Sequence, residues 1–103
     1  MSSVPRVLIV DDSAFMRSRI RRDLAEAGFE VVGEARDGLE AVSQYQKLHP
    51  DVVTMDLTMR GHDGIAGGTG ILNLDPKARL VLFTIVTEPD VIQKAMLVGF
   101  AAC

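Results

Sequence analysis

Two short apolar segments of this chain end in aspartate, and they constrain the fold more than any other feature. RVLIV at residues 6–10 precedes Asp11 and Asp12, and DVVTM at residues 51–55 precedes Asp56. Both segments are rich in β-branched residues, and the first is apolar on consecutive positions, which is typical of strands covered on both faces of a parallel sheet. Helices must then cover both faces, so the chain is predicted to be an α/β protein.

The rest of the sequence continues an alternation of strands and helices with right-handed connections. The predicted strands are 6–10, 29–35, 51–55 and 79–84, and the predicted helices run from the cap Ser13 to the stop Gly28, from Asp37 to His49, over 64–74 and over 91–99. Glycines 67, 68 and 70 each cost about 1 kcal/mol relative to alanine, so the third helix is expected to be weak or partly irregular. FAAC at 100–103 begins what reads as one more strand.

The composition indicates one globular domain over residues 1–103, because 48% of the residues are hydrophobic and 24% are charged. A net charge of −3 argues against nucleic acid as a direct partner, and the basic cluster RSRIRR at 17–22 is typical of a solvated helix face. The single Cys103 excludes an internal disulfide and a cysteine-rich metal site. No apolar run approaches the roughly 18 residues that span a bilayer, so we expect a cytoplasmic protein without a membrane partner.

The aspartates are expected to meet at one edge of the sheet, because ligands of parallel sheets bind at the carboxyl ends of the strands. Asp11, Asp12, Asp56 and Thr84 all follow or end predicted strands. Carboxylates about 4 Å apart repel by roughly 4 kcal/mol at an effective dielectric of 20, so the cluster needs protons or a cation. Oxygen ligands without histidine or thiolate favour Mg2+, and a carboxylate beside Mg2+ can accept a phosphoryl group. Helix-capping turns would explain each aspartate separately, but not their shared placement.

Several motifs carry a family resemblance. VLIVDDSAFMR, GEARDGLEAV and HPDVVTMDLTM, with DG at 63–64, resemble the receiver domain of bacterial two-component response regulators, in particular single-domain receivers of the chemotaxis-protein-Y kind. The resemblance covers about residues 5–103. It implies a flavodoxin-like parallel sheet with strand order 2-1-3-4(-5).

The resemblance also assigns roles to the residues at the sheet edge. It implies that Asp56 is the phospho-acceptor and that Thr84 hydrogen-bonds the phosphoryl group. It implies a Mg2+ site formed by Asp11, Asp12, Asp56 and the backbone carbonyl of Thr58. The implied partners are a histidine kinase or phosphotransfer protein as donor and a downstream protein target. Such a switch is not an enzyme, except that it catalyses its own phosphorylation and dephosphorylation.

The chain departs from the family pattern at several positions. Arg60 replaces a usual proline, His62 a usual apolar residue and Ile85 a usual very small residue. The family's lysine on the fifth strand and its fifth helix have no counterpart before Cys103. We therefore expect a receiver domain that is incomplete at its C-terminus and truncated after the fourth helix. Its fourth strand would be an unpaired edge, and a homodimer would form through that strand or the uncovered sheet face.

Three other functions each fit part of this sequence. The first is a degenerate receiver fold that serves as an interaction or dimerisation module and is not phosphorylated efficiently. Arg60, Ile85 and the missing lysine favour this alternative, whereas the intact acidic residues oppose it. A phosphatase of another aspartate-nucleophile family would need an aspartate two residues beyond the nucleophile, where this chain has Thr58. A flavin-binding protein would need a phosphate-binding loop after the first strand, and DDSAF has the wrong charge for it.

Overall fold

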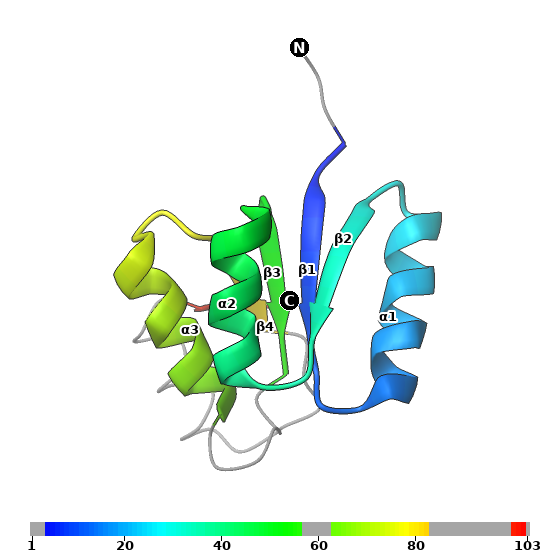
Figure 1. Cartoon of the computed structure of the whole chain (residues 1–103). Helices are drawn as coiled ribbons and strands as arrows, with labels where there is room; N and C mark the ends of the chain where they lie inside the picture. The colour runs from blue at the N-terminus through cyan, green and yellow to red at the C-terminus, as the bar shows by residue number, and fades with distance from the viewer. Residues whose placement is uncertain (1–3, 57–62, 83–99, 103) are drawn as a thin grey trace.

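The computed structural model describes residues 4–56, 63–82 and 100–102. In that part of the chain, parallel strands form one sheet in the order β2-β1-β3-β4-β5, which confirms the predicted flavodoxin-like order (Figure 1). The strands are β1 (Arg6–Val10), β2 (Glu30–Ala35), β3 (Val52–Met55), β4 (Leu80–Leu82) and β5 (Phe100–Ala102), and the helices are α1 (Ala14–Glu26), α2 (Gly38–Leu48) and α3 (Asp63–Leu74). The helix predicted over 91–99 lies outside the described residues.

The sheet is covered on both faces, as its apolar strands require. Figure 1 shows α1 on one side and α2 and α3 on the other. Successive side chains of β1 point to opposite faces. Leu8 and Val10 belong to the larger core cluster, which includes residues of α2 and α3, whereas Val7 and Ile9 pack with Ile20 of α1. The central strand is therefore buried on both sides and holds the residues that follow it in place.

Side-chain caps set where α1 and α2 begin. The Ser13 hydroxyl accepts a hydrogen bond from the Met16 N–H at 3.2 Å, and the Asp37 carboxylate accepts one from the Glu40 N–H at 2.7 Å. Both caps satisfy N–H groups that lack partners within the helix. α1 and α2 thus start directly after β1 and β2. No helix of the described residues is both long enough and apolar enough to cross a membrane.

The expectation of an unpaired fourth strand was wrong. β5 pairs with β4 in parallel, with Leu80 opposite Phe100 and Leu82 opposite Ala102. Because β4 is itself only three residues long, three residues of FAAC are enough to pair along its whole length. β4 is therefore not an edge strand, and the expected dimer through strand four loses its basis, whereas a dimer through the uncovered sheet face stays a prediction.

The third helix was expected to be weak or partly irregular, and the expected irregularity was wrong. α3 is continuous over twelve residues. A Cβ atom on Gly67 would lie 2.8 Å from the Cα of Gly38 in α2, and one on Gly70 would lie 2.8 Å from Cγ2 of Val42. These glycines let the backbones of α2 and α3 approach closely, and this packing offsets their poor helix propensity.

A hydrogen bond links α2 to the turn after α3. The Tyr45 hydroxyl donates to Asp75 Oδ2 at 2.7 Å, and Asp75 Oδ1 accepts from the Lys77 N–H at 3.0 Å. Burial raises the pKa of Tyr45 to about 12, with a further contribution from its bond to Asp75. The same hydrogen bond lowers the pKa of Asp75. This contact fixes the end of α3 at the edge of the sheet opposite to the aspartates.

Candidate functional site

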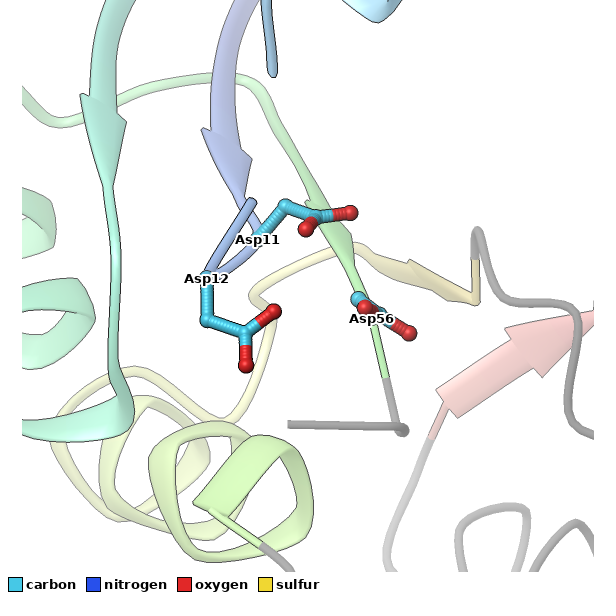
Figure 2. Close-up of side chains that lie close together, drawn as sticks. All are labelled: Asp11, Asp12 and Asp56. Atoms are coloured by element: carbon cyan, nitrogen blue, oxygen red, sulfur yellow. The ribbon is translucent and has the colours of Figure 1, made fainter. Parts of the chain in front are cut away.

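The structure brings three of the predicted site residues together. Asp11 and Asp12 follow β1, and Asp56 follows the neighbouring strand β3, where Val10 and Met55 are paired. Figure 2 shows the three carboxylates at the carboxyl ends of these strands. One oxygen of each lies within 4.8 Å of the others. The main chain adds a direct link, since the Asp56 N–H donates to the Val10 carbonyl at 3.1 Å. The predicted convergence of these residues is confirmed.

The cluster combines burial with like charge. Asp11 is 2% exposed and Asp56 is 7% exposed, whereas Asp12 is open to solvent. Burial raises the pKa of Asp11, and the charges of Asp56 and Asp12 raise it further. A hydrogen bond from the Ser13 N–H to Asp11 Oδ1, at 2.8 Å, and the charge of Arg17 oppose this rise without cancelling it. Ionisation of Asp11 is therefore less favourable here than in an isolated aspartate, and a bound cation would offset this cost.

An Asp11→Asn variant tests this repulsion in the metal-free protein. Asparagine can still accept from the Ser13 N–H, but it adds no charge. At neutral pH we expect the free energy of unfolding in EDTA to rise by about 1 kcal/mol, a fraction of the Coulomb repulsion between close carboxylates. Because the folded pKa of Asp11 is raised, ionisation begins to destabilise the fold above the unfolded pKa, and the loss is complete above the folded pKa. Urea denaturation in EDTA measures the gain in stability, and the same experiment in Mg2+ without EDTA measures the lost response to metal.

Asp51→Asn is the matched control for that experiment. Asp51 Oδ2 also accepts a hydrogen bond from a main-chain N–H, that of Arg6, at 2.8 Å. Asp51 precedes β3, at the opposite edge of the sheet from the cluster. We expect no gain in metal-free stability from this variant. An Asp11→Asn protein that is less stable than wild type in EDTA would contradict the proposed repulsion.

The basic cluster at 17–22 is only partly a solvated helix face, and this was missed from the sequence. Arg17 and Arg21 of α1 form ion pairs with the two carboxylate oxygens of Glu34 in β2, at 2.9 and 2.7 Å. Arg17 also donates from Nη1 to the carbonyl oxygen of Asp11 at 2.7 Å. Burial alone would raise the pKa of Glu34, but the hydrogen bonds and charges of Arg21 and Arg17 bring it below its usual value. The spacing of four residues between the two arginines was the available signal.

The donor set of the cluster fits a magnesium ion. Asp11, Asp12 and Asp56 offer hard carboxylate oxygens within reach of one another, and the exposed Asp12 leaves a side open to water. Mg2+ prefers such oxygens and retains several waters. The predicted ligand Thr58 and the predicted phosphoryl contact Thr84 lie outside the described residues, as do Arg60, His62 and Ile85.

Comparison with known proteins identifies the family. The chain matches the response regulator receiver domain over residues 7–103. It is 45% identical over 94 residues to protein CcdB of Bacillus subtilis and 43% identical over 94 residues to chemotaxis protein CheY of Thermotoga maritima, and each alignment covers 91% of this chain and 78% of the relative.

Solved structures agree with this match. The response regulator domain of Thermotoga maritima CheB superposes with a TM-score of 0.88 at 38% identity, covering 97% of this chain and 76% of that one. The CheX–CheY–BeF3–Mg2+ complex from Borrelia burgdorferi gives a TM-score of 0.86 at 32% identity, covering 92% of this chain and 72% of that one. With the sheet order and the acidic edge, these matches show that the chain belongs to the response regulator receiver domain family.

Proposed function

We propose that this chain is a phospho-accepting receiver of a two-component phosphorelay, with Asp56 as the acceptor. The observation that supports it most is the convergence of Asp11, Asp12 and Asp56 at one edge of the sheet, with ligand oxygens within 4.8 Å. Asp56 follows β3 and is 7% exposed, and the bond from its N–H to the Val10 carbonyl holds its backbone, so its carboxylate is largely shielded from water and projects from a fixed point of the main chain. Such a carboxylate is suited to nucleophilic attack.

The reaction is a transfer between two covalent carriers. A carboxylate oxygen of Asp56 attacks phosphorus and forms an acyl phosphate, while the bond from phosphorus to the donor's histidine nitrogen breaks and its electron pair stays on the imidazole. The donor is a histidine kinase or a phosphotransfer protein. Mg2+ held by Asp11, Asp12 and Asp56 would offset the negative charge of the transferring group. Catalysis by the chain is limited to its own phosphorylation and dephosphorylation.

The related complex from Borrelia burgdorferi supports two parts of this proposal, the bound Mg2+ and the binding of a partner protein. It contains a CheY with BeF3, which stands in for a phosphoryl group, together with Mg2+ and the protein CheX. By similarity, phosphorylation of this chain would change its binding to a downstream protein in the cytoplasm, as a shift between two conformational states. Thr84 remains the predicted hydroxyl that contacts the phosphoryl group, and the Thr58 carbonyl remains a predicted metal ligand.

Incubation of the wild-type protein with acetyl phosphate tests this proposal. We expect intact-mass spectrometry to show the gain of one phosphoryl group when Mg2+ is present and no gain in EDTA. Borohydride converts an aspartyl phosphate to homoserine, so peptide mapping after reduction should place the change at Asp56. A folded sample that gains no mass at any Mg2+ concentration would favour the interaction module without phosphorylation.

A further inference from the structure

The rigid guanidinium group of Arg17 contacts two different residues. Its Nε donates to Glu34 Oε1 at 2.9 Å, and its Nη1 donates to the carbonyl oxygen of Asp11 at 2.7 Å. The side chain is 18% exposed, so both bonds are largely shielded from water. Arg21 occupies the second oxygen of Glu34, at 2.7 Å, and thereby leaves Oε1 to Arg17. The planar guanidinium makes the direction of one bond depend on the other.

The carbonyl that Arg17 holds belongs to the peptide group between Asp11 and Asp12. That group is planar, and it includes the Cα atoms of both residues. Other bonds already fix the first aspartate: its N–H donates to the Ala35 carbonyl at 3.0 Å, and its carboxylate accepts from the Ser13 N–H. The remaining freedom is rotation of the next peptide plane, which directs Asp12 toward or away from Asp56. A bond to the carbonyl oxygen restrains this rotation.

We propose that Arg17, oriented by Glu34, is a positioning residue that sets the Mg2+ affinity of the acidic site through the peptide group between Asp11 and Asp12. This inference rests on the metal site of the proposed function. It assigns Arg17 no contact with the ion or the phosphoryl group. Groups that orient metal ligands from outside the coordination sphere commonly change metal affinity on the order of tenfold or more.

Arg17→Lys and Arg21→Lys form a matched pair for the test. Both variants keep the charge and both remove a guanidinium contact with Glu34, but only Arg17 touches the Asp11 carbonyl. A lysine ammonium lacks the planar fork that holds both acceptors in fixed directions. Titration of ¹⁵N-labelled protein with Mg2+, followed by NMR, gives the Kd and shows directly whether each variant is folded.

We expect the Kd for Mg2+ to rise about tenfold in Arg17→Lys and to stay within about twofold in Arg21→Lys. If the ion pairs only stabilise the fold, thermal unfolding in EDTA changes in both variants while both keep the wild-type Kd. That result overturns the inference. If Arg17→Lys does not fold, Glu34→Ala replaces it, since it removes both carboxylate oxygens that accept from the two arginines. A wild-type Kd in a folded Glu34→Ala protein would also overturn the inference.

The metal titration separates this inference from the proposed function. A weakened Mg2+ site in Arg17→Lys, combined with a wild-type protein that takes no phosphoryl group from acetyl phosphate, supports the positioning role and refutes the acceptor role of Asp56. An unchanged Kd in Arg17→Lys, combined with normal phosphorylation of the wild type, refutes the positioning role alone. A wild-type protein that binds no Mg2+ refutes both.

Discussion

An Asp56→Asn variant is expected to take up no phosphoryl group from acetyl phosphate in the presence of Mg2+. The amide has nearly the shape of the carboxylate, but its oxygen is a poor nucleophile and cannot form a stable acyl phosphate. Because Asp56 is 7% exposed within an acidic cluster, removing its charge also relieves repulsion, so the variant should remain folded. Intact-mass spectrometry at saturating Mg2+ measures the loss, which should be complete.

Asp37→Asn is the matched control for this variant. Asp37 follows β2, near the same edge of the sheet, but its carboxylate caps α2 by accepting from the Glu40 N–H at 2.7 Å. Asparagine caps helices about as well as aspartate, so the fold should be unchanged. We expect this protein to gain one phosphoryl group as the wild type does. Phosphorylation that persists in Asp56→Asn would show that another residue is the acceptor.

A Gly67→Ala variant should lower the free energy of unfolding by about 1–3 kcal/mol, although alanine is the better helix former. The added Cβ would lie 2.8 Å from the Cα and 3.2 Å from the carbonyl oxygen of Gly38. Both are backbone atoms of α2, which cannot move without displacing the whole helix from the sheet. Overpacking of this kind outweighs the gain of about 1 kcal/mol in helix propensity. Urea denaturation at equilibrium gives the difference.

Gly70→Ala provides the comparison within the same helix. Its Cβ would meet only Cγ2 of Val42, at 2.8 Å, which is a single methyl group of a half-buried side chain and not the backbone of α2. The steric loss and the gain in propensity then nearly cancel, and we expect a change within about 1 kcal/mol of wild type. Equal stabilities of the two variants would contradict the view that close backbone contact holds α3 against α2.

The sequence predicted the sheet and its acidic edge well because short-range patterns determine both. β1 was predicted at its observed bounds, since RVLIV is apolar on every position that the two faces bury. The meeting of Asp11 and Asp56 followed from strand ends alone. The observed start of α1 likewise followed from the predicted cap Ser13, and α2 begins one residue after the predicted start Asp37, which caps it.

The errors and omissions concern contacts between distant segments. The prediction for α3 used the helix propensity of glycine, which applies to an isolated helix. In the structure, Gly67 packs on the backbone of Gly38. The pairing of β5 with β4 depends on the chain placing residues 100–102 beside β4, which the composition of FAAC does not specify. The contact from Arg17 to Glu34 requires both the register of β2 and the rotation of α1 about its axis. Periodicity specifies neither of these.

The hydrogen-bonded hydroxyl of Tyr45 allows the unfolding of this protein to be followed by tyrosine fluorescence. The sequence contains no tryptophan and a single tyrosine, so fluorescence excited at wavelengths that phenylalanine does not absorb comes from one ring. A carboxylate acceptor such as Asp75, at 2.7 Å, quenches tyrosine fluorescence, and rupture of the hydrogen bond restores it. The emission therefore reports the docking of α2 against the turn after α3. Since that contact lies at the edge of the sheet away from Asp56, unfolding can be monitored optically while the acidic edge is altered independently.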